Sequence, residues 1–200
     1  RDVERSRGLG DVYKRQYLNS LVLSINPFGF RTYFRGSDKG DVKILTSKGW
    51  AKVYRTDISK GIEYIDQFKI IVGRFVPSNG EMSVKPGEGY RVLTEPQILS
   101  PAEINTETYI DTAVFCTLEE ATNYKKYLLT KFARFFLRQG ITSVNVTKEC
   151  FAFVPIQDFT INGDINWSGT IPEIDQQLYI KYHLTDEEIA FIEKMIKPMQ

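Results

Sequence analysis

The stretch from Thr117 to Gly140, TLEEATNYKKYLLTKFARFFLRQG, is the clearest structural signal in this chain of 200 residues. It opens with Thr117-Leu118-Glu119-Glu120, a capping box in which a hydroxyl and a carboxylate bind free backbone N–H groups at a helix start. Apolar residues then recur at steps of three and four: Leu118, Ala121, Tyr124, Leu128, Phe132 and Phe135. We therefore predict one long helix with one face in the core, closed by Gly140 in a left-handed conformation.

The segments before this helix have the composition of strands. Val42–Thr46 and Trp50–Tyr54 are β-rich runs joined by Ser47-Lys48-Gly49, which predicts a hairpin. Four more runs have strand-like composition: Phe68–Val76, Tyr90–Leu93, Thr106–Phe115 and, beyond the helix, Cys150–Ile156. A polar loop with glycine and proline, Pro77–Gly89, separates the first two of these.

The end of the chain is predicted to be helical. One helix is expected over Glu173–Tyr182, and a second capping box at Thr185 opens another that Pro198 ends. The apolar stripe of these helices is expected to face the core, with partner docking as the alternative: Ile174, Leu178, Ile189, Ile192 and Ile196. The predicted fold class is α+β, with a mixed sheet, one long packed helix and a C-terminal helical hairpin.

The predicted domain organisation has three parts. Residues 17–160 are expected to form the α+β domain, and residues 161–200 a loop and helical hairpin packed on it. Residues 1–16 carry five basic and three acidic residues without amphipathic period, and GLGDVYKRQ resembles a translated cloning adapter. We interpret them as a non-native or disordered segment. Without them the formal net charge of +1 becomes −1, so binding to DNA would need a local basic patch.

Composition excludes several classes of protein. Apolar content of 42% and charged content of 26% are typical of a globular chain, and no apolar run is long enough to span a membrane. We therefore expect a cytoplasmic protein. Cys116 and Cys150 stand alone, which argues against a disulfide framework and a zinc site.

Short motifs with catalytic associations are weak here. Asp41-Val42-Lys43 has the Asp-x-Lys spacing of many nucleases, but a charged hairpin face explains it better. His183 is the only histidine, and we expect it to end a helix. Asn26-Pro27-Phe28 is similar to the Asn-Pro-Pro-Tyr/Phe motif with which DNA amino-methyltransferases hold a flipped base, yet Gly29 follows where that motif needs rigidity. We predict a turn there, and no catalytic, cofactor-binding or metal-binding residue in this chain.

Charge is distributed unevenly along the sequence. Between Arg31 and Lys60 lie eight basic and three acidic residues, interleaved with aromatic residues, whereas Gly163–Ile196 holds seven acidic residues and two lysines. Such segregation is typical of a surface that meets phosphates, although a solvated sheet face is the alternative. The candidate DNA-binding residues are Arg31, Arg35, Lys39, Lys43, Lys48 and Lys52.

Four strings in order carry a resemblance to a known family: INPFGFRTYFRG, NTETYIDTAVFCTLEEATNYKKYLLTKFARFFL, FAFVPIQDF and EIDQQLYIKYHLTDEEIAFIEKMIKPM. They resemble the C-terminal region of DNA adenine methyltransferases and of combined methylase/endonuclease polypeptides of bacterial restriction-modification systems. The resemblance covers Tyr17 to Met199 and is most specific in the last string.

The resemblance implies a target recognition domain that reads double-stranded DNA. From charge and loop position alone, we expect the sheet and the loops Phe30–Lys43 and Pro77–Gly89 to enter or flank a groove. The partner of this domain would be a catalytic methyltransferase domain upstream in the parent chain, which would bind S-adenosylmethionine. We interpret this chain as a fragment without that domain, and so not an enzyme by itself. Two alternatives are a protein-interaction domain that docks a catalytic subunit and the specificity domain of a restriction endonuclease.

Overall fold

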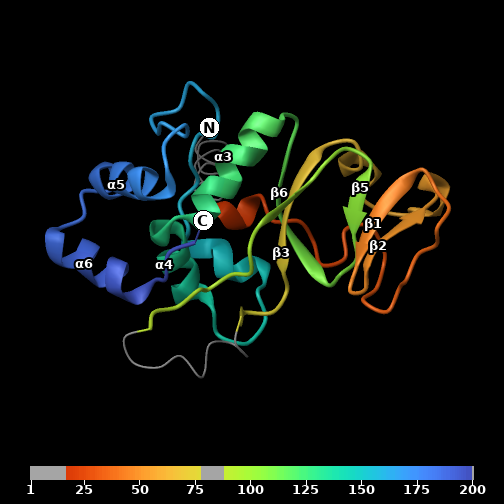
Figure 1. Cartoon of the computed structure of the whole chain (residues 1–200), viewed down its shortest axis with the longest axis horizontal. Coiled ribbons are helices and arrows are strands. Elements are labelled where there is room, and N and C mark those ends of the chain that lie inside the picture. The colour runs from red at the N-terminus through yellow and green to blue at the C-terminus, as the bar shows by residue number, and fades with distance from the viewer. Residues whose placement is uncertain (1–16, 78–87, 200) are drawn as a thin grey trace, which may run out of the picture.

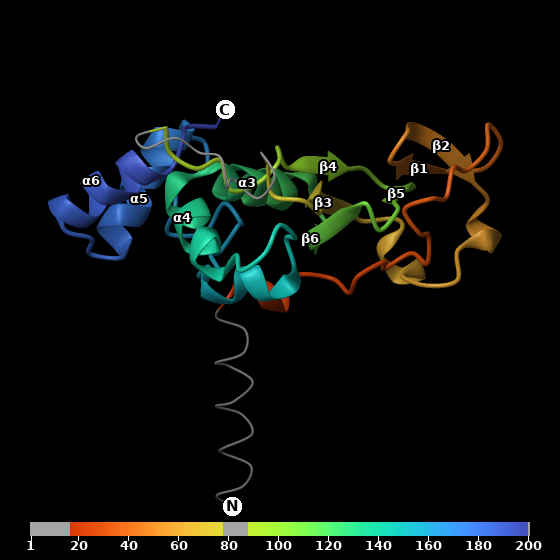
Figure 2. The same ribbon diagram turned by 90° about the horizontal axis from the view of Figure 1, so that it is seen from below.

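The computed structural model describes residues 17–77 and 88–199, which form an elongated α+β protein (Figure 1). Two three-stranded sheets occupy one end and the middle of the molecule, and most helices lie at the other end. Figure 2 shows the larger sheet and α3 between the smaller sheet and the C-terminal helices. The predicted fold class is confirmed.

The smaller sheet has the order β2-β1-β5, with β1 at Val42–Thr46, β2 at Gly49–Val53 and β5 at Glu103–Asn105. The predicted hairpin is present as the antiparallel pair β1–β2, while β5 runs parallel to β1. One face of this sheet covers a compact core of seven buried residues: Phe28, Val42, Ile44, Val53, Ile58, Ile65 and Ile104. We call residues 28–66 together with β5 the small lobe.

The larger sheet has the antiparallel order β4-β3-β6, with β3 at Phe68–Gly73, β4 at Gln97–Leu99 and β6 at Tyr109–Phe115. It belongs to the large lobe, by which we mean the remaining described residues. The core of the large lobe draws on segments from Leu18 to Ile196 and therefore includes residues on both sides of position 160.

The predicted long helix is divided into α3, Leu118–Leu129, and α4, Lys131–Gly140, because Thr130 leaves the helical conformation (φ −63°, ψ 150°). The Thr130 hydroxyl donates to the Tyr127 carbonyl at 2.6 Å and accepts from the Ala133 N–H at 3.1 Å. One side chain thus ends α3 and caps α4.

The start of α4 is also held from outside the helix. The carboxylate of Asp175 in α5, Ile171–Lys181, accepts hydrogen bonds from the N–H groups of Lys131 and Phe132 at 3.0 and 2.9 Å. These contacts satisfy backbone donors that a helix start leaves free. The apolar stripe runs through both helices without interruption, so periodicity alone cannot reveal a break set by a distant carboxylate.

Gly140 does not adopt the predicted left-handed conformation. A Cβ at this position would lie 2.6 Å from the carbonyl oxygen of Cys150, so the glycine permits close packing of the segment beside it. That segment is a 3₁₀-helix, η4, at Lys148–Phe153, where the composition of Cys150–Ile156 had predicted a strand. A short apolar run fits either structure, and the packing against α4 decides between them.

The predicted strand at Tyr90–Leu93 is also absent. Tyr90 forms a single bridge with Ile196, and its N–H donates to the Met195 carbonyl at 2.7 Å. Val92 then takes a positive φ of 74°, which a regular strand does not allow. This segment pairs with the end of the last helix and with no named strand.

The C-terminal helical hairpin consists of α5 and α6, the latter at Asp186–Met195. His183 lies between them with a φ of 54°, and its N–H donates to the Ile180 carbonyl at 3.1 Å. The N–H of Leu184 donates to the Tyr179 carbonyl at 3.0 Å, which completes a Schellman motif. The apolar stripe of the hairpin packs into the core of the large lobe, as expected for a core-facing surface.

Three short 3₁₀-helices complete the described structure: η1 at Leu18–Ser20, η2 at Arg55–Asp57 and η3 at Ile62–Tyr64. In residues 17–77 and 88–199, none of the helices combines the length and the apolar character needed to cross a bilayer.

Candidate nucleic-acid interface

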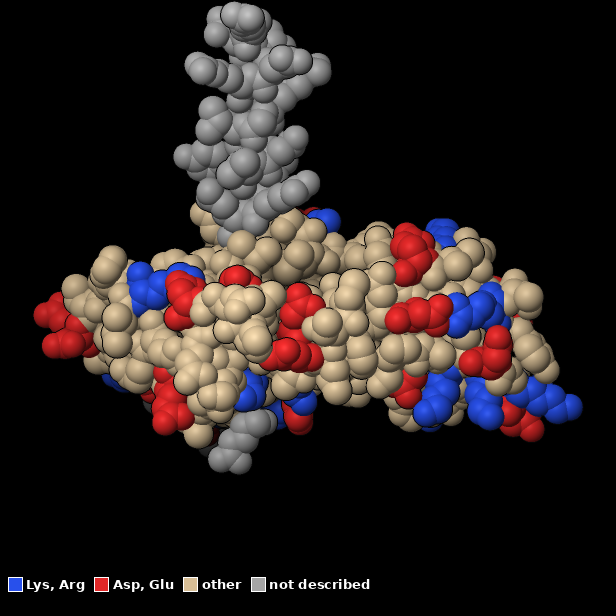
Figure 3. All heavy atoms as spheres, turned by 90° about the horizontal axis from the view of Figure 1, so that it is seen from above, with Lys and Arg blue, Asp and Glu red and all other residues tan. Residues whose placement is uncertain are grey.

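All six candidate DNA-binding residues lie in the small lobe, and all are exposed. They occur on the β1–β2 hairpin and on the preceding loop, residues 30–40. Figure 3 shows lysine and arginine side chains gathered at this end of the molecule, interspersed with acidic ones. The interface is therefore a mixed surface whose unpaired cations have to be identified one by one.

Lys43 and Lys52 lie opposite each other in the β1–β2 register. Side chains alternate between the faces of a strand, so both lysines are on the outward face while Val42, Ile44 and Val53 point into the small core. Two like charges directly opposite each other destabilise a pair of strands unless other interactions compensate their repulsion. This cross-strand pair is the first feature of the interface that the structure brings together.

The hairpin turn presents Lys48 and Arg35. The Lys48 N–H donates to the Thr46 hydroxyl at 3.1 Å, which fixes the turn. Arg35 comes from the preceding loop, and its Nη1 donates to the Ser47 hydroxyl at 3.1 Å and to the Thr32 carbonyl at 3.2 Å. These bonds hold the guanidinium against the tip of the hairpin.

The loop that carries Lys39 presses against the free edge of β2. Ser37 forms a two-way backbone bridge with Lys52 at 2.9 and 2.8 Å. Gly40 has a φ of 139°, and a Cβ there would lie 2.3 Å from the carbonyl oxygen of Val53. The glycine is required for this approach, which brings Lys39 to the end of the hairpin away from the turn.

Two of the candidate cations are paired with carboxylates. Arg31 Nη1 lies 3.0 Å from Glu107, and Lys43 Nζ lies 3.1 Å from Glu103. Burial tends to raise the pKa of Glu107, but hydrogen bonds from Thr32 and Arg31 outweigh it, and the pKa is lowered. Neither partner was identified from the sequence, because each lies far along the chain from its cation.

The remaining four candidates, Arg35, Lys39, Lys48 and Lys52, form no ion pair with any residue in 17–77 or 88–199. They are therefore the cations that a phosphate could approach without displacing a carboxylate. Most of the predicted groove-flanking loop Pro77–Gly89 lies outside the described residues.

The weak catalytic motifs have local structural roles. Asn26 has a φ of 59° and its carbonyl accepts from the Gly29 N–H at 3.3 Å, which forms a turn. Asp41 accepts from the backbone N–H of Arg55 at 2.8 Å, so the Asp-x-Lys pair is used within the small lobe. Within the described ranges, no three histidine, cysteine or acidic side chains are grouped so that they could hold a metal ion.

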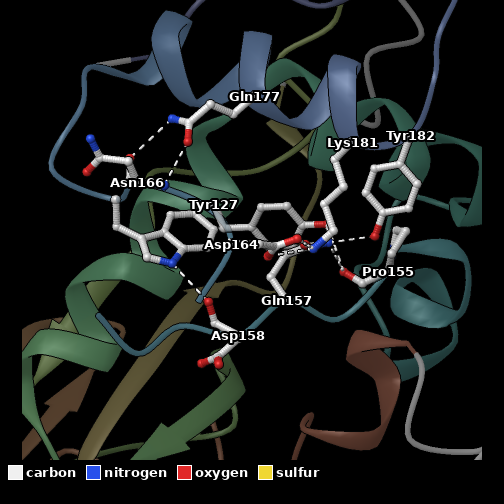
Figure 4. A network of polar contacts seen from close by, with 10 residues as sticks. Tyr127, Pro155, Gln157, Asp158, Asp164, Asn166, Gln177, Lys181 and Tyr182 are labelled. Atoms are coloured by element: carbon white, nitrogen blue, oxygen red, sulfur yellow. Dashed lines mark hydrogen bonds and ion pairs between the residues drawn. The ribbon is translucent and has the colours of Figure 1, made fainter. Parts of the chain in front are cut away.

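A second polar cluster lies in the large lobe, and its members bind one another (Figure 4). Buried Gln157 donates to the Tyr182 hydroxyl and accepts from Lys181 Nζ, both at 2.8 Å. Lys181 also donates to Asp164 at 2.8 Å, while Trp167 Nε1 donates to the Asp158 carbonyl at 2.9 Å. These groups bind each other, so the cluster fastens residues 155–167 to α5.

Comparisons of this chain with models of protein families, with curated proteins and with solved structures found no match.

Proposed function

We propose that this chain binds double-stranded DNA as the target recognition region of an adenine-specific DNA methyltransferase of a bacterial restriction-modification system, in the cytoplasm. One observation carries the proposal. Arg35, Lys39, Lys48 and Lys52 lie exposed on the β1–β2 hairpin and its flanking loop, at one end of the molecule and without ion pairs to described residues.

The shape of this element suits a DNA groove. The major groove is about 12 Å wide and admits a two-stranded β-ribbon. If the turn of the hairpin enters it, Arg35 and Lys48 reach base edges or phosphates first, and Lys52 and Lys39 follow along the backbone. Arg35 is the better candidate for a guanine contact, because its planar fork matches the O6 and N7 acceptors.

Methyl transfer itself is assigned to a separate catalytic domain that binds S-adenosylmethionine. The described residues do not fit that cofactor: β6 leads into α3 through Cys116-Thr117, with no glycine to let a backbone approach a nucleotide. The cofactor would supply the methyl group there, and the chain described here would position the target sequence.

The test is DNA binding by the double variant Lys48→Ala/Lys52→Ala. Both side chains are exposed, so the fold should be unaffected. Each phosphate-contacting lysine contributes about 1 to the slope of log K against log salt, so the slope should fall by about 2. Fluorescence anisotropy with a labelled duplex over a series of salt concentrations measures this.

The matched control is Lys148→Ala/Lys194→Ala, which removes two exposed lysines from the large lobe. The control should keep the affinity and the salt slope of the unmodified chain. Equal losses in both double variants, or no loss in either, would contradict a hairpin interface. Circular dichroism of each variant verifies that the fold is retained.

A further inference from the structure

The outward face of β2, together with the residue that follows the strand, carries a lysine with one aromatic ring on each side of it. Trp50 and Lys52 alternate with Ala51 and Val53, which pack on the small core, and Tyr54 follows in the same phase. Trp50 and Tyr54 are each 52% exposed. The order along this face is therefore ring, cation, ring.

The neighbouring strand extends this pattern. Lys43 of β1 lies opposite Lys52, and Leu45, which is 7% exposed, lies opposite Trp50. Among the described residues, neither Trp50 nor Tyr54 has an aromatic ring stacked against it. Two large apolar surfaces are thus left open beside two cations.

Exposed aromatic rings with lysines beside them suit one kind of ligand. Bases stack on aromatic side chains in complexes of single-stranded nucleic acid, and a positively charged surface follows the backbone. Trp50 and Tyr54 are four residues apart, which is about 13 Å along a strand, so an extended nucleotide chain can bring one base to each ring. In a duplex the base faces are covered by neighbouring pairs.

We propose that the outward face of β2 binds single-stranded nucleic acid, with Trp50 and Tyr54 stacked on unpaired bases and Lys52 and Lys43 on the phosphates between them. This inference goes beyond duplex recognition by the hairpin turn. Glu103 is the acidic residue paired with Lys43, so Lys52 provides the stronger attraction for phosphate.

The charge around the rings distinguishes this face from the exposed aromatic side chain of Phe191. Phe191, which is 54% exposed, lines a groove between α4 and α6 together with Glu187 and Glu188. Carboxylates repel phosphates, so that groove does not suit nucleic acid. The β2 face combines open rings with lysines on its own and the adjacent strand.

The test uses the fluorescence of the chain's two tryptophans. Trp167 is 4% exposed and donates to a backbone carbonyl in the large lobe, so quenching by a stacked base reports Trp50. The probes are a 12-nucleotide oligothymidylate, the matching oligouridylate and a 12-base-pair duplex. We expect quenching with at least one single strand and weaker quenching with the duplex, and the two single strands distinguish DNA from RNA.

Substitution of the rings measures their contribution. Stacking is worth about 1–3 kcal/mol per base, so Trp50→Leu or Tyr54→Leu should weaken single-strand binding, followed by anisotropy, about 5- to 150-fold. Trp50→Phe keeps a ring and should recover part of the affinity. The control is Phe153→Leu, which removes an aromatic side chain that is 55% exposed on the large lobe and should change nothing.

The outcomes separate this inference from the proposed function. Duplex binding without single-strand binding overturns the stacking face and leaves duplex recognition intact. Single-strand binding that Trp50→Leu weakens, without duplex binding, supports the stacking face and overturns the proposed function. Single-strand affinity that is equal in Trp50→Leu and the unmodified chain also overturns the stacking face.

Discussion

The two lobes differ in the size of their cores and in how some of their lysines and aromatic residues are used. Twenty-eight buried apolar residues form the large core, against seven in the small one. In the large lobe, two lysines bind groups of the lobe itself: Lys126 donates to the Trp167 carbonyl at 2.6 Å, and Lys181 to Gln157 at 2.8 Å. In the small lobe, Lys48 and Lys52 point to solvent. Lys126 and Lys181 therefore stabilise the fold, whereas Lys48 and Lys52 are available to another molecule.

Aromatic residues differ between the lobes in the same manner. In the large lobe Tyr124, Tyr127, Phe159 and Trp167 form a cluster with ring centroids 5.1 to 6.1 Å apart. The aromatic residues of β2 and its flanks are open to solvent instead. The large lobe thus holds the larger aromatic cluster, whereas Trp50 and Tyr54 of the small lobe are half exposed and can meet another molecule.

The largest expected effect comes from comparing a core substitution in each lobe. Phe132 is fully buried against Phe136 and Tyr182, and Phe132→Ala should cost about 3–5 kcal/mol of unfolding free energy. Ile44→Ala in the small core should cost about 2–5 kcal/mol. Urea unfolding followed by circular dichroism at 222 nm measures both.

The two variants should differ in whether DNA binding and helical structure are lost together. The helices α3 to α6 lie in the large lobe. Near the midpoint of its urea unfolding, Ile44→Ala should therefore lose DNA binding while it keeps most of the circular dichroism signal of the helices. Phe132→Ala should lose both together. Coincident loss of binding and helical signal in Ile44→Ala would mean that the lobes unfold as one unit and would break the comparison.

The sequence predicted local structure best where one segment decides it. Thr117 and Thr185 identify two helix starts, and the β1–β2 hairpin follows from its turn and flanking runs. The prediction failed where a distant group determines the local conformation. Asp175 binds the start of α4, and Tyr90 pairs with the end of the last helix. Composition identifies a segment as apolar, but its partners settle its conformation.

The candidate interface shows the same limit. Charge along the sequence identified residues 31–60 as basic, and all six candidate residues are exposed there. It could not separate Arg31 and Lys43, which are paired with Glu107 and Glu103, from the four cations without such partners. The ring-lysine-ring order on β2 was visible in the sequence as a spacing of two residues, once the strand was assigned.

At the junction between the lobes, we expect an effect of intermediate size on the pH dependence of the unfolding free energy. Asn105 of β5 donates to Asp111 of β6 at 2.9 Å, and burial raises the pKa of Asp111 from 3.8 to about 7. The folded chain therefore holds this proton up to about pH 7, whereas the unfolded chain releases it near pH 3.8. Unfolding releases a proton between these values, so stability should fall as pH rises through them.

Asp111→Asn removes this titration. The difference in unfolding free energy between pH 5 and pH 7 should shrink by an amount on the order of 1–3 kcal/mol. Buried Lys69 donates to three backbone carbonyls, and burial lowers its pKa to about 8, so it stays charged in this range. Urea unfolding at both pH values is the measurement, and an unchanged pH dependence would show that Asp111 titrates normally.

The smallest expected effect on stability is that of Glu103→Gln, which removes the partner of Lys43. The Lys43 side chain is 61% exposed, and glutamine keeps an amide oxygen that can accept from the Ser100 N–H as Glu103 does, so the unfolding free energy should change by about 0–1 kcal/mol. Affinity for nucleic acid at low salt should nevertheless rise roughly twofold to fivefold, because one charge that repels phosphate is gone. Asp164→Asn, which removes the partner of Lys181 in the large lobe, is the matched control and should leave affinity unchanged. If both variants raised affinity equally, net charge would govern binding, which would contradict a binding surface on the small lobe.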